Sequence, residues 1–105
     1  MSDATVKLDG KAFAAQLHTQ FKVNTADGAP MVVELFEVLE PQSPPQIELF
    51  LLHFRGPLAP RLPQRIHQFD HEKLGAFDLF ITAIGADEKG IAYEAVFNRL
   101  RKPQA

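Results

Sequence analysis

The spacing of apolar residues changes once along this chain, from the period of a helix to that of strands. Near the N-terminus Phe13 and Leu17 are four residues apart, which places both on one face of a helix. From Gln20 onward, apolar residues alternate with polar ones or form short runs bounded by turn residues. No helical pattern separates these runs, which argues against parallel strands joined by crossover helices. The pattern predicts a mainly β fold with one helix and an antiparallel meander.

A single domain over residues 1–105 is expected, with a helix at 8–18, antiparallel strands over 20–98 and a frayed basic tail at 99–105. Asp9 is the expected N-cap of the helix, with Leu8 and Phe13 forming a hydrophobic staple around it. About six strands are expected, over residues 20–25, 31–40, 46–54, 64–70, 76–84 and 91–97.

The segment 31–40 has two possible structures. Its glutamates and leucines recur at three- and four-residue spacing, which suits a helix. Pro30 and the Asp-Gly turn signal at 26–29 precede it and β-branched residues open it, which favours a strand. A helix here would lower the strand count and make closure of the sheet doubtful.

The runs 46–54 and 76–84 are apolar on both faces, which predicts strands covered on both sides. Six such strands would curl, and closure removes exposed sheet edges. We therefore expect a strongly curved sheet or a small barrel, with Phe13 and Leu17 packed on it or plugging one end. The nine phenylalanines are expected to fill the core.

Composition excludes several functional classes. The chain of 105 residues has no cysteine, which excludes a thiolate nucleophile and any cysteine-ligated metal site. Its net charge of -2 gives no reason to expect a nucleic-acid partner, and no apolar run is long enough to span a membrane. A soluble, cytoplasmic protein with a protein partner is expected, either a monomer or a homodimer.

The sequence contains no motif specific to catalysis, so no catalytic residue, cofactor or metal is expected. Ser2 and Ser43 lie outside any nucleophile elbow. His67 and His71 have the four-residue spacing of a helical metal pair. On an extended strand the same spacing separates them by about 13 Å, which disfavours a shared ion.

Two sets of residues are candidates for a binding site. The loop 56–63 contains three prolines that stiffen it, apolar anchors and flanking arginines. Its candidate partner contacts are Arg55, Leu58, Arg61, Leu62 and Arg65. A competing structural reading has the loop fold Leu58 and Leu62 back over one end of the core. The second set, a ligand or enzyme site at the mouth of the barrel, comprises His53, His67 and His71.

The charged residues have an alternative role as ion pairs. Four glutamates fall in a stretch without lysine or arginine: Glu34, Glu37, Glu40 and Glu48. Three arginines lie around the proline loop with no acidic residue between them: Arg55, Arg61 and Arg65. Pairing between the two groups is favoured over an anion site.

Four motifs place the chain beside a known family. They are FRGP at 54–57, LPQ at 62–64, LGAFDLF at 74–80 and YEAVFNR at 93–99. In this order and spacing they resemble a bacterial family classified only as a domain of unknown function, whose members occur near proteins with phage-tail-collar domains. The chain departs from the family at 65–67, where Arg-Ile-His replaces the usual glycine and aromatic residue.

The expected function is that of a non-catalytic protein-interaction or accessory module. The resemblance implies a link to a phage-tail-like assembly. The alternative is a small-ligand-binding β-barrel, or an enzyme, that uses a histidine at the barrel mouth.

Overall fold

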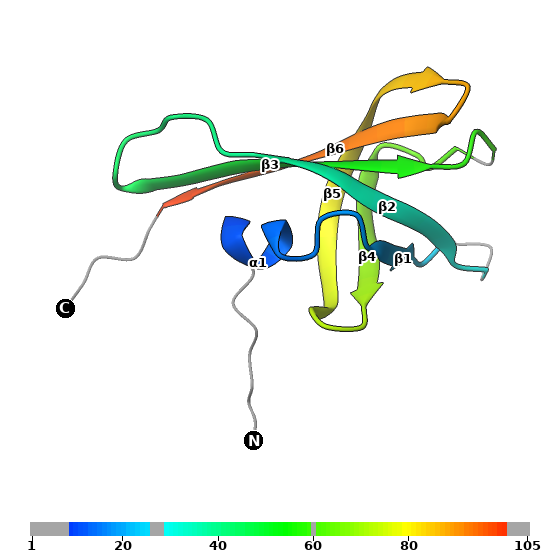
Figure 1. The fold of residues 1–105 in the computed structure, drawn as a ribbon, viewed down its shortest axis with the longest axis horizontal. Helices are drawn as coiled ribbons and strands as arrows, with labels where there is room; N and C mark the ends of the chain where they lie inside the picture. The colour runs from blue at the N-terminus through cyan, green and yellow to red at the C-terminus, as the bar shows by residue number, and fades with distance from the viewer. Residues whose placement is uncertain (1–8, 26–28, 60, 101–105) are drawn as a thin grey trace.

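The computed structural model describes residues 9–25, 29–59 and 61–100 of the chain. Within these ranges, one short helix is followed by six strands (Figure 1). In chain order the elements are α1 (Gly10–Ala14), β1 (Gln20–Val23), β2 (Met31–Leu39), β3 (Ile47–Gly56), β4 (Arg65–His71), β5 (Gly75–Asp87) and β6 (Gly90–Leu100).

The six strands form a closed antiparallel barrel in the order β1-β2-β3-β6-β5-β4. Pairing of β1 with both β2 and β4 closes it, so the expected small barrel is confirmed. The expected meander is wrong, because β3 lies beside β6 and not beside β4. The β3–β6 ladder runs from Ile47 opposite Leu100 to Gly56 opposite Ile91. Pro57 and Pro63 prevent a tight hairpin after β3, so the chain crosses to the far side of the barrel before β4 begins.

Segment 31–40 is a strand over Met31–Leu39, as the preceding turn signals and the β-branched residues favoured. Met31, Val33 and Leu35 point into the barrel and are buried, whereas Val32 is exposed. After Leu35 the register with β3 shifts by one residue, and Phe36 is the additional residue of this β-bulge. The bulge places Phe36 and Glu37 side by side on the outer surface before Val38 turns inward again.

The helix is shorter than the expected range 8–18, ending at Ala14. Asp9 caps it as expected, its Oδ1 accepting a hydrogen bond from the Ala12 backbone N–H at 2.9 Å. The other half of the expected staple, Leu8, lies outside the described residues. Leu17 does not pack on the barrel as expected, because it lies beyond the helix and is 38% exposed.

The helix does not continue through His18 because the backbone there forms hydrogen bonds with strand β2. The His18 N–H donates to the carbonyl oxygen of Leu35 at 2.6 Å, and Leu35 N–H donates to the carbonyl of Thr19 at 3.2 Å. His18 adopts a positive φ of 67° at this junction. These bonds begin the β1–β2 ladder and leave Leu17 on the surface.

Phe13 plugs one end of the barrel. The β5–β6 ladder joins Thr82–Asp87 to Gly90–Glu94, so the first half of β5 and the last half of β6 diverge. Helix α1 lies in the angle between them (Figure 1). The Phe13 ring centroid is 5.6 Å from that of Phe77 on β5 and 5.6 Å from that of Phe97 on β6.

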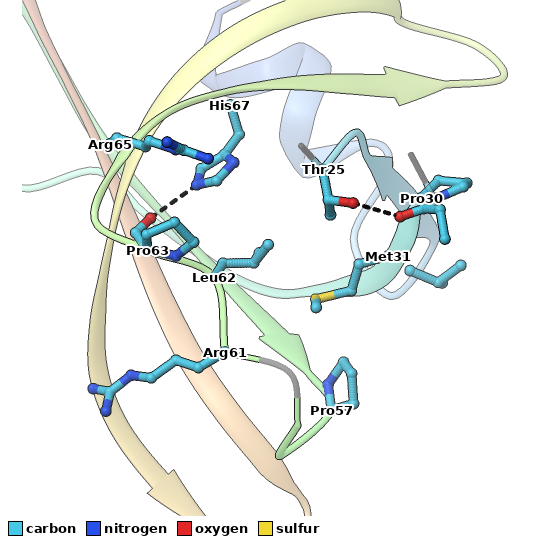
Figure 2. Close-up of a pocket in the computed structure, with 11 residues that line it drawn as sticks. Thr25, Pro30, Met31, Pro57, Arg61, Leu62, Pro63, Arg65 and His67 are labelled. Atoms are coloured by element: carbon cyan, nitrogen blue, oxygen red, sulfur yellow. Dashed lines mark hydrogen bonds between the residues drawn. The ribbon is translucent and has the colours of Figure 1, made fainter. Parts of the chain in front are cut away.

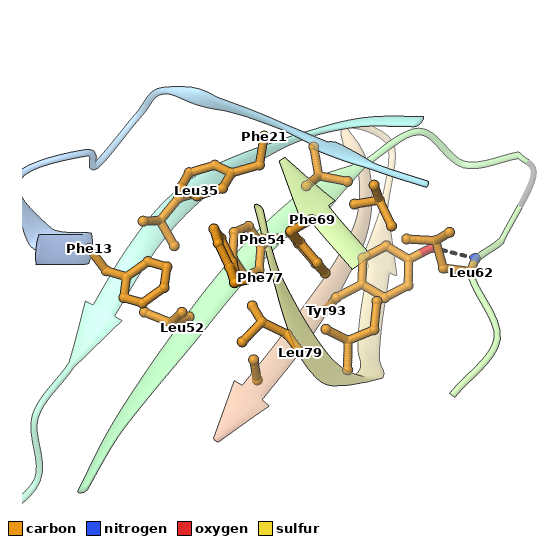
Figure 3. Packing of buried hydrophobic residues seen from close by; sticks show 14 of the residues in the cluster. Phe13, Phe21, Leu35, Leu52, Phe54, Leu62, Phe69, Phe77, Leu79 and Tyr93 are labelled. Atoms are coloured by element: carbon orange, nitrogen blue, oxygen red, sulfur yellow. Dashed lines mark hydrogen bonds between the residues drawn. The ribbon is translucent and has the colours of Figure 1, made fainter. Parts of the chain in front are cut away.

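The core runs from Phe13 at one end to Leu62 and Tyr93 at the other (Figure 3). Seven of the nine phenylalanines fill or pack against it, whereas Phe36 and Phe80 lie on the outer surface. The expected two-sided cover of β5 is wrong. Phe80 is 52% exposed and Ile84 is 49% exposed, because the strand faces the barrel interior with one side only.

β5 also extends beyond its expected end at residue 84, to Asp87, with a register shift after Ala83. Gly90 begins β6 with a φ of 143°, and a Cβ there would clash with the Gly56 carbonyl oxygen. This position therefore needs glycine. β6 extends to Leu100; the rest of the expected tail, 101–105, lies outside the described residues, as does most of the Asp-Gly turn, 26–28.

Candidate functional site: a pocket at the open end of the barrel

A pocket of about 670 Å³ opens at the end of the barrel opposite α1. Three parts of the chain converge on it: the β1–β2 connection, the loop after β3, and the start of β4 (Figure 2). The lining residues are Thr25, Ala29, Pro30, Met31, Val32, Pro57, Arg61, Leu62, Pro63, Arg65 and His67. Its volume falls in the range of small-ligand sites.

The inner wall of the pocket is apolar and is fixed by core packing and a buried hydrogen bond. Leu62 is 4% exposed and Met31 is 7% exposed, so both belong to the core as well as to the pocket. The Leu62 backbone N–H donates to the hydroxyl of Tyr93 at 2.9 Å (Figure 3). This bond joins the crossing loop to β6 inside the barrel.

His67 is the buried polar side chain of the pocket. It is 5% exposed, and its Nε2–H donates to the carbonyl oxygen of Pro63 at 2.8 Å (Figure 2). The bond ties the end of the crossing loop to β4. Among the described residues, the other ring nitrogen, Nδ1, has no hydrogen-bond partner.

Two arginines complete the polar lining. Arg65 lies two residues before His67 on β4, so both side chains emerge on the same side of the strand, and Figure 2 shows the Arg65 side chain running toward His67. The Arg61 side chain extends away from the apolar wall in the same view. Within the described part of the chain, neither guanidinium makes an ion pair with an acidic residue.

The loop residues predicted to contact a partner lie in different places in the structure. Arg61, Leu62 and Arg65 line the pocket, and Leu58 is 55% exposed. Leu62 therefore folds back over the core, as the competing reading had it, whereas Leu58 does not. Arg55 lies elsewhere, on the outer face of β3 with its guanidinium carbon 4.4 Å from the ring centroid of Phe36.

Of the three histidines predicted at the barrel mouth, only His67 lies there. His53 is on the outer face of β3, where Nδ1 lies 2.9 Å from Glu37 Oε1 and Nε2 lies 3.0 Å from Glu94 Oε2. Burial lowers the pKa of His53, but the hydrogen bonds to Glu94 and Glu37 and the charges of both outweigh it. The pKa is therefore raised above its ordinary value of 6.5.

His71 lies at the other end of β4, near the helix. Its Nδ1 accepts hydrogen bonds from the backbone N–H groups of Lys73 and Leu74, at 3.0 and 3.3 Å. The proton is thus on Nε2, which donates to Thr19 Oγ1 at 2.9 Å. Burial lowers the pKa of His71 below 6.5, the charge of Glu72 opposes this, and that of Lys73 adds to it. The ring holds the β4–β5 turn to the start of β1.

The ion pairs differ from those expected between glutamates and arginines. Two of the four glutamates contact histidines: Glu34 lies 3.2 Å from His18, and Glu37 lies 2.9 Å from His53, which Glu94 also contacts at 3.0 Å. The bulge at Phe36 explains part of this, because it places Glu37 opposite His53. Arg61 and Arg65 consequently keep their charge available at the pocket.

The described lining residues provide groups for binding rather than for catalysis or metal coordination. The Thr25 hydroxyl donates to the carbonyl of Ala29 at 2.7 Å, and none of the lining residues that the structure describes is acidic. In the described ranges no group of three or more histidine or acidic residues is arranged to hold a metal. His67 and His71 share the inner face of β4 with Phe69 between them. Chemically, the site can enclose an apolar body and neutralise an anion.

Reasoning from sequence missed the half of the pocket that comes from the β1–β2 connection. Thr25, Pro30 and Met31 reach the site because closure of the barrel brings β1 beside β4. No local pattern signals this contact, which joins segments far apart in the chain. From sequence, Pro30 indicates only the boundary of the following strand.

Comparison with known proteins gives a family and no function. No curated protein and no solved structure matches the chain. In the described residues no helix has the length and apolar character needed to cross a membrane. Residues 8–97 match the family model named Domain of unknown function (DUF6916). Since the match covers most of the sequence, including the pocket, the chain belongs to the DUF6916 family.

Proposed function

We propose that this domain is a non-catalytic binding module whose site is the pocket at the open end of the barrel. The observation that carries the proposal is the pocket itself: about 670 Å³, enclosed by three segments and walled by apolar side chains. A small β-barrel commonly holds its ligand at such a mouth. Of the two functions considered from sequence, small-ligand binding therefore has the stronger geometric support.

A second observation supports binding without catalysis. The hydroxyl of Thr25 and the Nε2–H of His67 are engaged as donors to the carbonyl oxygens of Ala29 and Pro63. A nucleophile with an adjacent base, which covalent catalysis needs, has no counterpart among the described lining residues. The barrel interior below the mouth is filled by the core, so the ligand lies in the mouth.

The test uses N-phenyl-1-naphthylamine, an uncharged probe that fluoresces in apolar sites. We expect saturable binding of one probe per chain. Replacing Ala29, an exposed lining residue, by Phe fills the mouth and should weaken binding at least about tenfold. Replacing exposed Ala76 on β5 by Phe is the matched control and should leave binding unchanged. Equal binding by both variants would place the probe elsewhere and refute the site.

Interaction with a protein partner is the second candidate, favoured by one specific observation. Leu58 on the crossing loop is 55% exposed, beside the exposed Arg61. Arginine is enriched at binding hot spots. Replacing Leu58 and Arg61 by Ala should weaken capture of a protein partner while the melting temperature stays within about 4 °C. Unaltered capture, or a large loss of stability, would make the loop purely structural. The accessory role in a phage-tail-like assembly belongs to this candidate and rests on the family resemblance.

A further inference from the structure

We infer that the ligand of the pocket is a small amphiphilic acid, with its apolar body against Leu62 and Met31 and its anionic group paired with Arg65. This inference rests on the proposed function and names the chemical class that the site selects. It follows from the distribution of charge, hydrogen-bonding capacity and apolar surface around the mouth.

The charge of the lining has one sign. Among the described residues, the ionisable side chains of the lining are Arg61, Arg65 and His67, and none is an aspartate or glutamate. The whole chain, by contrast, has a net charge of -2. The arginines are not neutralised by acidic partners within the described residues. An anion is therefore attracted to this mouth although the protein as a whole is slightly acidic.

Among the polar groups, Arg65 is the one placed to bind the anion. The Nε2–H of His67 is used by Pro63, and the Thr25 hydroxyl is used by Ala29. The Arg61 side chain points away from the apolar wall, whereas that of Arg65 runs toward His67 at the edge of the pocket (Figure 2). Its guanidinium presents paired N–H donors that match the two oxygens of a carboxylate.

The apolar wall requires that the anion carry a hydrophobic body. Met31 and Leu62 are core residues that reach the pocket, and prolines continue the wall to its rim: Pro30, Pro57 and Pro63. A simple anion such as phosphate would leave this surface wet and gain only the charge pairing. A carboxylate with an aliphatic or aromatic body uses both parts of the site.

The experiment compares two probes with the same aromatic skeleton, 8-anilinonaphthalene-1-sulfonate and uncharged N-phenyl-1-naphthylamine. At low salt the wild-type protein should bind the sulfonate about tenfold more tightly, as expected for one charge-assisted contact. Arg65→Gln should abolish this preference and keep binding of the uncharged probe. Arg61→Gln removes the same charge from a side chain that points away, and should retain most of the preference. Decanoate should displace the sulfonate probe more strongly than decanol.

The outcomes distinguish failure of the anion contact from failure of the proposed binding function. If both probes bind equally, or if Arg65→Gln keeps the preference, the anion contact is refuted and the apolar site stands. If Arg61→Gln loses as much as Arg65→Gln, a diffuse positive field explains the data and Arg65 is not the anchor. Displacement by an acidic peptide but not by decanoate would overturn the small-acid assignment. If neither probe binds, the proposed function fails as well.

Discussion

The backbone N–H of Leu62 donates a hydrogen bond to the hydroxyl of Tyr93 inside the barrel, at 2.9 Å. Leu62 belongs to the loop that crosses the open end, and Tyr93 belongs to β6 and is 1% exposed. A buried N–H without a partner is costly, so the tyrosine hydroxyl stabilises the loop in its inward position. The same contact gives the pocket its inner wall.

Replacing Tyr93 by Phe tests this relationship. The ring is kept, but the Leu62 N–H is left buried and unpaired, so we expect the free energy of unfolding to fall by about 1–3 kcal/mol. Urea denaturation measures the change. Thr25→Ala is the control, because it removes an exposed hydroxyl bonded to Ala29 and should cost no more than about 0.5 kcal/mol.

The Tyr93→Phe variant should also bind the uncharged naphthylamine probe more weakly, because Leu62 is less firmly held against the pocket. Equal losses of stability in the Tyr93 and Thr25 variants would show that the buried bond has no special weight. Lower stability with unchanged probe affinity would separate the loop anchor from the pocket.

The strands could be predicted because their information is local. For β2, Pro30 and the Asp-Gly signal before it and the β-branched residues that open it favour a strand over a helix, and the burial of Met31, Val33 and Leu35 on one face agrees with this. The order of strands could not be predicted in the same way. Pairing of β3 with β6 is a contact between distant segments, and it depends on how the whole sheet closes.

The site was predictable in part for the same reason. One short stretch of the chain contains Arg61, Leu62, Arg65 and His67. Its prolines and arginines indicate a binding surface. The orientation of each side chain was not encoded locally. His53 turned outward because it lies on the opposite face of β3 from Phe54, and Glu37 and Glu94 are its cross-strand neighbours.

The plug formed by Phe13 gives a second prediction. Phe13 is fully buried among aromatic rings, so Phe13→Ala should destabilise the fold by about 3–5 kcal/mol through lost contacts and a cavity. Leu17→Ala is the matched control from the same segment, where the side chain is 38% exposed, and it should cost less than about 1 kcal/mol. Thermal or urea unfolding measures both. Comparable losses in the two variants would contradict the short helix and restore Leu17 to the core.

The third prediction concerns the outer-face group Glu37, His53 and Glu94. The folded-state pKa of His53 is raised above 6.5, so the folded protein binds a proton more tightly than the unfolded chain does. The stabilisation is fully present below pH 6.5 and is lost as pH rises through the folded-state pKa. The free energy of unfolding should therefore fall across this interval.

His53→Gln removes the titrating group and provides the comparison. The stability difference between wild type and this variant should be largest near about pH 5.5, where the glutamates remain charged, and should shrink by about pH 8.5. Urea denaturation at a series of pH values measures it. A difference that is constant with pH, or that grows as pH rises, would show that the two carboxylates do not hold the proton on His53.

His71 gives the last prediction, with the opposite sign. Its folded-state pKa is lowered below 6.5, mainly by burial, so the unfolded chain binds the proton more tightly. Its stabilising contribution is present above pH 6.5 and is lost as pH falls through the folded-state pKa, because protonated Nδ1 can no longer accept from Lys73 and Leu74. His71→Asn keeps an acceptor near that position and does not titrate. The difference in the free energy of unfolding between wild type and this variant should shrink from about pH 7.5 to about pH 5. If the difference instead grows as the pH falls, the Nδ1 of His71 does not accept these hydrogen bonds.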